Sequence, residues 1–368
     1  MPKTVTIDAR WLVGGIGTYI RSLLQEFHRL ANDIQIQAIV REQDACSIQE
    51  LCAGVTVLDT PIYTLREQVQ VVRATRGCDL LHVPHFNAPL FHRGPLLVSI
   101  MDVIHLSSAA YSRKLSTLLY ARPMLNAIAR KADHVVTVSD YSKDQIMESL
   151  GIPDSKITVI PCGVSHEFIP ASKRTESSSV SVIPGVQKPF LLYVGNLKPH
   201  KNVPTLLRAF AQLREKRQLP HSLLIVGDDP RWKSSVVEEC LRLGIRDCTH
   251  LVSHVSQSLL PRVYAAADLL VMPSTLEGFG LPVLEAMACG TPVVASNAAS
   301  LPQVAGDAAL YFDPASPEEL GAQIERILQS LELRDLLRNK GVQRARQFSW
   351  QQSARRHMQL YSQLLGVN

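Results

Sequence analysis

The sequence predicts an α/β fold built from two Rossmann-like domains with parallel sheets. Short β-branched and aliphatic runs alternate with longer stretches of helical period along nearly all of the 368 residues. This alternation is typical of parallel sheets with crossover helices. The pattern breaks once, over residues 171–188, where Ser is abundant and the segment ends near Pro and Gly. The length also suits two domains of roughly 100 to 200 residues each.

The first domain is expected over residues 1–170, with a helix over residues 19–30 between its first two strands. Its strands are predicted at residues 4–10, 34–40, 80–84, 95–102 and 134–140. Residues 171–188 then form a solvated linker to the second domain.

The second domain is expected over residues 189–348. Its strands are predicted at residues 189–195, 222–229, 249–253, 267–274 and 291–297. The last segment, residues 349–368, has helical spacing of its apolar side chains, which are Trp350, Ala354, Met358, Tyr361 and Leu365. Because this helix follows the second domain's own final helix, we expect it to pack back on the first domain.

Composition excludes several classes of protein. With 46% hydrophobic and 19% charged residues, the chain is neither disordered nor collagen-like. Seven cysteines without a C-x-x-C pair predict neither a disulfide framework nor a zinc ribbon.

A dispersed net charge of +5 predicts no nucleic-acid partner and is compatible with anionic substrates. No apolar run approaches the roughly 20 residues of a spanning helix, and no secretion signal precedes the first strand, so we expect a cytoplasmic protein.

One stretch, residues 107–132, combines basic and apolar side chains and contains no acid. Its basic residues are Arg113, Lys114, Arg122, Arg130 and Lys131. A basic amphipathic helix can lie on the anionic inner face of a membrane, at about 1 kcal/mol per basic side chain near the surface. It can equally bury its apolar stripe in the core and leave its charges in water. The sequence leaves peripheral membrane contact and this second arrangement open, and Pro123 interrupts the helix in both.

The most informative segment is residues 272–297, MPSTLEGFGLPVLEAMACGTPVVASN. A strand ends at Pro273, a loop carries Glu277 and two glycines, and Pro282 suits the first turn of a helix to about residue 289. Open α/β sheets bind ligands at the carboxyl ends of their strands, and a glycine-lined helix start there favours an anion. Glu277 and Glu285 would flank that anion. Two carboxylates beside a phosphate are unfavourable unless hydroxyl groups bind them, which a sugar provides.

Glu277 and Glu285, with GFGLPVL between them, resemble the E-x7-E motif of retaining GT-B glycosyltransferases of group 1 (family four). Other matching segments are GGIGTYI, HVPHFNAP, MDVIH, VTVSDYSKDQI, VIPCGV, YVGNLKPHKN and GFGLPVLEAMACGTPVV. The resemblance covers nearly the whole chain and is greatest to bacterial mannosyltransferases that build surface polysaccharides. It implies two domains whose parallel sheets face a central cleft, the first (residues 1–170) being the acceptor domain and the second (residues 189–348) the nucleotide-sugar-binding domain. It also implies that Glu277 contacts the donor sugar's hydroxyls and Glu285 the ribose of the nucleotide.

The segment YVGNLKPHKN places a cationic loop after a strand that ends at Gly195. The resemblance implies that Lys201 binds the donor diphosphate, as a compact ammonium can. An arginine often occupies position 196 in the family, whereas this chain has Asn196. Either Lys198 substitutes for it or the donor is held less tightly.

The remaining donor-binding candidates are glycines and their neighbours. By resemblance we add Gly227, Phe279, Gly280 and Leu281 to Gly195, Asn196, Lys198 and Glu285. Asp228 and Asp229 are adjacent and not spaced as D-x-D, and lysines with helix-start amides can neutralise a diphosphate. We therefore expect no metal ion and no cofactor.

Near the start of the chain, GGIGTYI places Gly15 and Gly17 directly before a helix. It fails as a dinucleotide fingerprint because Ile20 follows where Gly or Ala is required. The resemblance implies that this loop faces the donor phosphates across the cleft, with Thr18 where the family often has an arginine. The alternative is a plain tight turn.

Several side chains lie just past predicted strand ends in the first domain. They are His82, His85, Asp102 and His105, and hydrogen bonding within the core is the alternative for each. The family often has a histidine directly before the aspartate, and this chain has Met101 there, so His105 is the candidate replacement. His85 and Gly163 are assigned to the acceptor or cleft region. We expect Asp140 or Ser142 to cap the helix that carries residues 145–150.

Together these residues predict a retaining enzyme that moves mannose from GDP-mannose to a glycan or lipid-linked acceptor in surface polysaccharide synthesis. The catalytic candidates are Glu277, Lys201, His105 and Asp102. The base pocket, expected near Val252 to His254 and Tyr264, does not distinguish guanine from uracil, so a UDP-sugar donor is an alternative. A nucleotide-sugar 2-epimerase of the same fold and a non-catalytic sensor are the other hypotheses.

Overall fold

The computed structural model describes residues 2–30, 33–62, 64–104, 115–170 and 183–367, with the side chains of residues 115–122 left out. The chain divides into two compact units. Unit 1 contains Met1–Gly163 and Ser349–Asn368, and unit 2 contains Val164–Phe348. Each unit is described by itself below.

Unit 1 contains a parallel sheet of seven strands in the order β3-β2-β1-β4-β5-β6-β7. The strands are β1 (Lys3–Asp8), β2 (Ile34–Val40), β3 (Gly54–Val57), β4 (Leu80–Val83), β5 (Leu96–Ser99), β6 (His134–Thr137) and β7 (Ile157–Val159). The helices are α1 (Gly14–Arg29), α2 (Glu42–Gln49), α3 (Leu65–Ala74), α5 (Leu115–Lys131), α6 (Asp140–Leu150) and α14 (Trp350–Leu365), with a 3-10 turn η1 (Asp154–Lys156).

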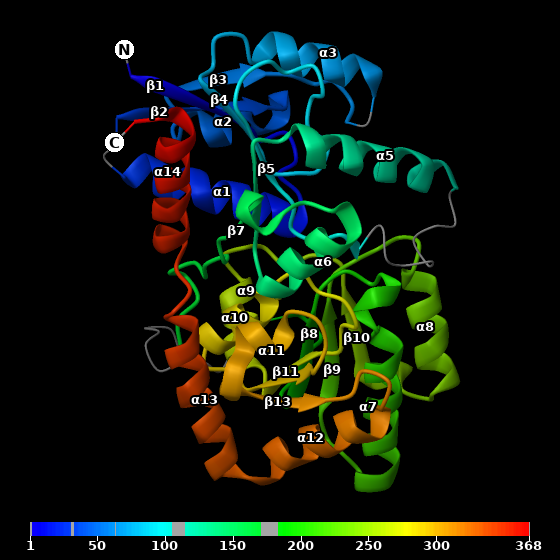
Figure 1. Cartoon of the computed structure of the whole chain (residues 1–368). Helices are drawn as coiled ribbons and strands as arrows, with labels where there is room; N and C mark the ends of the chain where they lie inside the picture. The colour runs from blue at the N-terminus through cyan, green and yellow to red at the C-terminus, as the bar shows by residue number, and fades with distance from the viewer. Residues whose placement is uncertain (1, 31–32, 63, 105–114, 171–182, 368) are drawn as a thin grey trace. The chain divides into compact units, whose positions relative to one another are not determined.

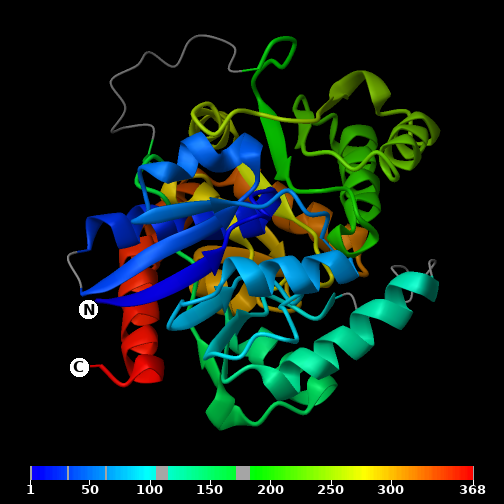
Figure 2. The same ribbon diagram turned by 90° about the horizontal axis from the view of Figure 1, so that it is seen from above.

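The core of unit 1 follows from the apolar patterns of these elements. All four residues of β4 and of β5 are buried, as expected for central strands of a parallel sheet. On α1, Tyr19, Leu23 and Phe27 are buried at intervals of four residues, so one stripe of the helix faces inward. Figures 1 and 2 show α14, in red, beside α1 in this unit.

Unit 2 contains a parallel sheet of six strands in the order β10-β9-β8-β11-β12-β13. The strands are β8 (Phe190–Val194), β9 (Ser222–Val226), β10 (Thr249–Val252), β11 (Leu269–Met272), β12 (Val293–Ser296) and β13 (Ala309–Phe312). The helices are α7 (Val203–Arg217), α8 (Lys233–Arg242), α9 (Leu260–Ala266), α10 (Leu281–Ala288), α11 (Leu301–Ala305), α12 (Pro317–Gln329) and α13 (Leu331–Ala345). The short 3-10 turns are η3 (Pro199–Lys201), η4 (Arg246–Cys248) and η5 (Gly306–Ala308).

Both sheets reverse their strand order at one point. In unit 1 the reversal lies between β1 and β4, and in unit 2 it lies between β8 and β11. Open α/β sheets bind ligands at the carboxyl ends of the strands beside such a reversal. We call this edge of each sheet the ligand-binding edge of its unit.

The prediction of two parallel α/β sheets is confirmed, and every strand predicted from the sequence is present. The predictions omitted β3, β7 and β13, which are edge strands of three or four residues. None of the three is buried along its whole length, whereas β4 and β5, which are equally short, are completely buried and show a continuous apolar run.

The unit boundary differs from the prediction at one place. Residues 164–170 belong to unit 2, whereas the sequence assigned them to the first domain. The N–H of Val164 donates to the carbonyl of Phe348, and the Phe168 ring packs edge-on against Tyr264 at 5.9 Å, so this segment is held by unit 2. Most of the expected linker, residues 171–182, lies outside the described residues, and the final helix α14 groups with unit 1.

Within the described residues, no helix combines the length and apolar character needed to cross a bilayer. The basic stretch of residues 107–132 falls largely outside the described side chains, so its two predicted arrangements stay open.

Candidate active site

Two oppositely charged side chains meet at the ligand-binding edge of unit 2. Lys201 ends the η3 turn after β8, and Glu277 lies in the loop after β11. The ammonium of Lys201 donates to Oε2 of Glu277 at 2.6 Å, and both residues are buried. The two loops are also joined through backbone, because the N–H of Thr275 donates to the carbonyl of His200 at 2.8 Å. The structure thus places a buried ion pair at the edge where α/β sheets bind ligands.

Tyr193, on β8, supports the loop that carries the lysine. Its hydroxyl donates to the carbonyl of Asn196 at 2.6 Å. Burial and the charge of Glu277 raise the pKa of Tyr193 well above its ordinary value, so the hydroxyl keeps its proton as a donor. The side-chain oxygen of Asn196 accepts from the backbone N–H of Lys198 at 3.2 Å. Asn196 therefore shapes its own loop, and Lys198 lies partly exposed at the start of that turn.

Glycines let the strand ends of unit 2 approach one another. Gly227, directly after β9, has φ +145°, and a Cβ built on it would overlap the carbonyl oxygen of Gly195 after β8. The N–H of Gly195 donates to Val226 at 2.9 Å, which continues the ladder between these strands. A side chain at position 227 would separate the two strand ends beside Lys201.

The α10 helix begins at Leu281, after the loop that carries Glu277, with Pro282 in its first turn as predicted. Its N-cap is Gly280 at φ +101°, and no side chain of the described residues caps it. Ser300 donates to the carbonyls of Glu277 at 2.9 Å and Phe279 at 3.1 Å, which holds the preceding loop in place. The glycine therefore leaves backbone N–H groups and the positive end of a helix dipole beside the Lys201–Glu277 pair.

Glu285 lies one turn further along α10 and is held by a tyrosine. The hydroxyl of Tyr264 donates to Oε2 of Glu285 at 2.7 Å, and Tyr264 is fully buried. Burial raises the pKa of Glu285 to about 7, although the hydrogen bond from Tyr264 acts in the opposite direction. Near neutral pH this carboxyl is therefore a mixture of protonated and ionised forms. Tyr264, which was expected near the base pocket, is thus the buried partner of Glu285.

The structure brings together the predicted residues of unit 2 along one edge: Gly195, Asn196, Lys198, Lys201, Gly227, Glu277, Phe279, Gly280, Leu281 and Glu285. Asp228 pairs with Lys233 at 3.6 Å, and Asp229 accepts from the N–H of Arg231 at 3.1 Å. Over the described residues, no group of three or more His, Cys, Asp or Glu side chains is arranged to hold a metal ion.

The glycines near the start of the chain differ slightly from their prediction. Helix α1 begins at Gly14, so Gly15 and Gly17 lie in its first turn and not before it. A Cβ on Gly17 would overlap the carbonyl carbon of Leu12, whereas a Cβ on Gly15 would meet none of the described atoms within 4 Å. Gly17 is thus required by close backbone packing, and Gly15 lies in open space.

The described first-domain candidates of unit 1 have different local contacts. His82 is completely buried and bonds to Tyr361 and to Ser99, each at 2.7 Å, so it is a core residue. Asp102 accepts from the N–H of Ile104 at 3.1 Å, within its own turn. His85 lies partly exposed after β4, and His105 lies outside the described residues.

Two further predictions for unit 1 are resolved by local contacts. Gly163 lies against the start of α14, where a Cβ would overlap the N–H of Trp350, so a glycine is required for packing at this position. The cap of α6 was predicted at Asp140 or Ser142, and this is wrong. Ser139 caps the helix by accepting from the N–H of Ser142 at 3.0 Å, because α6 begins at Asp140.

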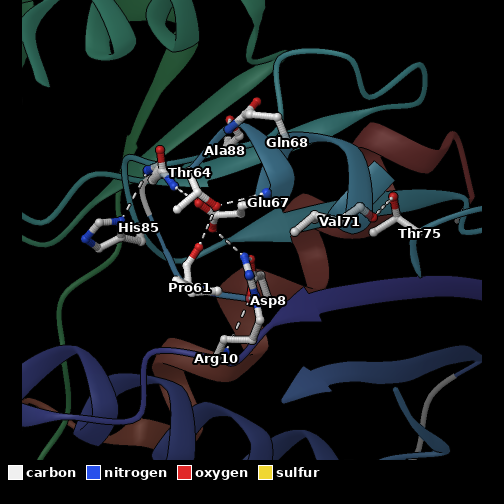
Figure 3. A network of polar contacts seen from close by, with 11 residues as sticks. Asp8, Arg10, Pro61, Thr64, Glu67, Gln68, Val71, Thr75, His85 and Ala88 are labelled. Carbon is white, nitrogen blue, oxygen red and sulfur yellow. Dashed lines mark hydrogen bonds and ion pairs between the residues drawn. The ribbon is translucent and has the colours of Figure 1, made fainter. Parts of the chain in front are cut away.

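Sequence reasoning missed a buried polar network in unit 1, shown in Figure 3. It joins Asp8 and Arg10, at the end of β1, to Glu67 on α3 and Asn87 after β4. The sequence could have indicated Asp8 and Arg10, because both lie near the end of a predicted strand, which is the criterion by which His85 was selected. Only their contact with residue 67, far away in sequence, depends on the fold.

Comparison with known proteins adds two family matches. The family model described as Glycosyl transferases group 1 matches residues 175–344, and the one described as Glycosyltransferase Family 4 matches residues 13–168. The O-antigen chain mannosyltransferase B of Escherichia coli is 32% identical over 77% of this chain and 74% of the relative. The MMP α-(1→4)-mannosyltransferase of Mycolicibacterium hassiacum is 31% identical over 66% of this chain and 57% of the relative.

Solved structures agree with this fold over nearly the whole chain. The Anabaena protein HepE in complex with UDP-glucose has a TM-score of 0.79 at 19% identity, over 98% of this chain and 99% of the other. Sucrose-phosphate synthase from Thermosynechococcus elongatus has a TM-score of 0.78 at 23% identity, over 99% of both chains.

Proposed function

This chain belongs to the group 1 glycosyltransferases of the GT-B fold, and from this premise we propose that it transfers mannose from GDP-mannose to a glycan or lipid-linked acceptor with retention at the anomeric carbon. It is a hexosyltransferase in this proposal, with surface polysaccharide as the product. The two similar mannosyltransferases, at 31% and 32% identity, support the choice of sugar.

The contact between Lys201 and Glu277 is the observation that carries the proposal. A buried ammonium beside a strand end can bind the donor diphosphate, and its partner carboxylate can accept hydrogen bonds from the sugar hydroxyls. Without a ligand each neutralises the other at 2.6 Å, so neither charge is buried alone. A nucleotide sugar supplies an anion for one and hydroxyl donors for the other, and therefore satisfies both.

Other groups at this edge bind the diphosphate and the ribose of the nucleotide sugar in this proposal. Backbone N–H groups at the start of α10, after Gly280, stabilise charge that develops on the leaving diphosphate. Glu285 accepts from the ribose hydroxyls, with Tyr264 holding its second oxygen. Gly195 and Gly227 keep the ends of β8 and β9 close beside the phosphates.

In the proposed transfer, the bond between the anomeric carbon and the diphosphate oxygen breaks while the acceptor oxygen bonds to the same carbon from the same face. The acceptor's proton passes to the leaving phosphate, which balances the charge. Lys201 and the α10 amides stabilise the departing phosphate, and Glu277 stabilises the positively charged sugar. In this scheme no protein nucleophile is required.

A panel of nucleotides and variants tests the proposal. We expect GDP to raise the melting temperature more than UDP or ADP, because a ligand stabilises the fold in proportion to its affinity. We expect Glu277→Ala and Lys201→Ala to lose at least about a hundredfold in turnover, as single stabilising groups of this kind do. Exposed Glu238→Ala and Lys216→Ala in the same unit are the matched controls.

Each outcome separates the candidate functions. A product with α-linked mannose, formed from GDP-α-mannose, supports retention, and an inverted linkage refutes it. Isomerisation of the donor without any acceptor would favour the 2-epimerase. Stabilisation by UDP alone would refute GDP-mannose as donor. Near-normal turnover in both unit 2 variants would remove the mechanism.

A further inference from the structure

A series of buried hydrogen bonds joins α14 to the core of unit 1. Tyr361, on α14, bonds to Nδ1 of His82 at 2.7 Å, and Nε2 of the same ring bonds to Ser99 at 2.7 Å. Ser99 lies 3.2 Å from the hydroxyl of Tyr19, which bonds to Nε2 of His357 at 2.7 Å. We call this series the hydrogen-bond chain. It begins and ends on α14 and passes through β4, β5 and α1.

The carbonyl of Ser353 sets the direction of the bonds at one end of the hydrogen-bond chain. It lies 2.8 Å from Nδ1 of His357, and a carbonyl can only accept, so this nitrogen carries a proton. In a neutral ring Nε2 is then an acceptor, and the hydroxyl of Tyr19 donates to it. The single proton of Tyr19 is used in this bond, so Tyr19 accepts from Ser99.

The same reasoning determines the bonds at the other end. The proton of Ser99 points to Tyr19, so Ser99 accepts from Nε2 of His82. Nδ1 of the neutral His82 ring is therefore an acceptor, and the hydroxyl of Tyr361 donates to it. His82 and His357 thus have opposite tautomers, with the proton on Nε2 of the first ring and on Nδ1 of the second.

Both rings are neutral because they are buried without a counter-charge. His82 and His357 are completely buried and stack on each other with centroids 5.8 Å apart. Burial lowers the pKa of both, to about 4 for His357 and well below its ordinary value for His82. Within the described residues, the hydrogen-bond partners of the two rings are hydroxyls and one carbonyl, and none is a carboxylate.

The other groups packed around the hydrogen-bond chain also supply no negative charge. Phe27, on α1, lies edge-on to His357. Cys162 interacts with Tyr19, and burial raises the pKa of this thiol, so it stays neutral. Arg356 neighbours His357 on α14, and its positive charge lowers the pKa of the ring further. A proton added to either histidine would therefore meet only neutral or positive groups.

Such a proton would also disrupt the order of the hydrogen bonds. On Nδ1 of His82 it would make Tyr361 an acceptor, and the hydroxyl proton of Tyr361 would lose its partner. On Nε2 of His357 it would turn the proton of Tyr19 toward Ser99, whose own proton would then lose Tyr19 as its acceptor. Leaving a buried donor without an acceptor is unfavourable, in addition to burying the charge.

We propose that the hydrogen-bond chain is a pH-sensitive latch, which holds α14 on unit 1 while both histidines are neutral and releases it when one of them takes up a proton. Release brings His357 into water and leaves His82 without its partner Tyr361. Residue 349 directly follows Phe348, the last residue of unit 2, so the latch fixes the segment by which the protein returns from unit 2 to unit 1. This proposal does not depend on the transferase activity.

The direction of the pH effect follows from proton binding. With α14 released, His357 binds a proton near its ordinary pKa of 6.5, whereas the docked ring does so only near 4. The released form therefore holds more protons within this window, and docking weakens as pH falls through it. Each proton taken up on release raises the equilibrium constant for opening about tenfold per pH unit.

Nitrogen-15 NMR of the histidine-labelled full-length protein tests the order of the protons in the wild type. At pH 7 we expect one buried neutral ring with its proton on Nδ1, whose signals disappear in His357→Gln. We expect a second one with its proton on Nε2, whose signals disappear in His82→Gln. Tyr361→Phe is a milder variant for the assignment, because it removes only the bond to Nδ1 of His82. The same tautomer on both rings, or a charged ring at pH 7, would overturn the proposal.

Hydrogen exchange of the full-length protein between pH 7 and pH 4.5 tests the release. After correction for intrinsic rates, we expect α14 amides to lose protection roughly tenfold per pH unit relative to β1 and β2, and to recover it at neutral pH. His28→Gln, at an exposed position on α1, is the matched control and should behave as the wild type does. Equal loss in α14, β1 and β2 would mean that unit 1 unfolds as a whole and would refute the latch, as would constant protection of α14.

Discussion

Replacing Glu285 by Gln should remove a loss of stability that unit 2 of the wild type shows as pH rises. Burial raises the pKa of this carboxyl to about 7, from an ordinary value of 4.5. Between these two values the native state holds a proton that the unfolded state has released, so stability falls as pH rises through this window. Above pH 7 the ionised carboxylate is present in both states, and the destabilisation is complete. Glutamine keeps a hydrogen-bond acceptor for Tyr264 and never ionises.

The magnitude follows from the interval between the two pKa values. At ~1.4 kcal/mol per pH unit, an interval of about 2.5 units corresponds to about 3 kcal/mol for a completely buried group. Glu285 retains part of its surface in water, so we expect about 2 kcal/mol. The free energy of unfolding of Glu285→Gln, minus that of the wild type, should therefore increase by about 2 kcal/mol between pH 5 and pH 8.

Native-state hydrogen exchange provides the assay. Amides of β11, α10 and β12 (residues 269–296) report on unit 2, and amides of unit 1 serve as the internal reference. Exposed Glu238→Gln is the matched control, with no expected change. The same carboxyl should also affect the donor, because ribose hydroxyls bind the ionised form best. Affinity for the nucleotide sugar should rise as pH increases through 7 in the wild type and stay flat in the variant. A difference in stability that does not vary with pH would refute the reasoning.

Three further predictions concern other contacts. Burial lowers the pKa of His357 to about 4, and its neutral ring bonds to Tyr19 at 2.7 Å, so unit 1 should lose about 3 kcal/mol as pH falls from about 6.5 to 4. His357→Gln should remove most of this slope, measured by hydrogen exchange in α14, and an unchanged slope would contradict the prediction. Lys201→Met should lower the free energy of unfolding by about 3 kcal/mol, because it leaves Glu277 buried without its cation. The double variant Lys201→Met with Glu277→Gln should lose less stability than the sum of the losses in the two single variants, as measured by urea unfolding. Additive costs would show that the pair is not coupled. Gly163→Ala should destabilise the docking of α14 by at least about 1 kcal/mol, since its methyl group would overlap the N–H of Trp350. Gly151→Ala is the control for backbone strain alone, because Gly151 has a φ of +65° and its methyl group would meet no described atom within 4 Å. Equal protection of α14 in Gly163→Ala and the wild type would exclude this packing role.

Much of the fold could be predicted because its central strands are buried on both faces. β4, β5, β11 and β12 consist of four buried residues each, so they read as continuous apolar runs. The edge strands β3, β7 and β13 lack this signature, since one side of each has no neighbouring strand. The α14 helix was predicted from its apolar spacing, but the spacing did not show that His357 belongs to the buried stripe. A histidine becomes part of a core only where partners such as Tyr19 satisfy it.

The start of α10 was predicted from the sequence, because Gly280 and Pro282 after the Glu277 loop are typical of a helix N-terminus. The roles of individual residues in the candidate donor site remain predictions. The sequence could not show that Lys201 contacts Glu277, since 76 residues separate them along the chain. Nor could it show that Tyr264 lies against Glu285, where burial raises the pKa of the carboxyl.

The sequence by itself determined the central strands and most helices, and it determined which loops after the strands contain glycine, glutamate and lysine. These properties depend on neighbours within a few residues. The tertiary structure alone decided which charges meet, such as Arg10 with Glu67 and Lys201 with Glu277, and how far each is withdrawn from water. Electrostatic energies depend on distance in space and on burial, and both arise only when the sheet brings distant strand ends to one edge.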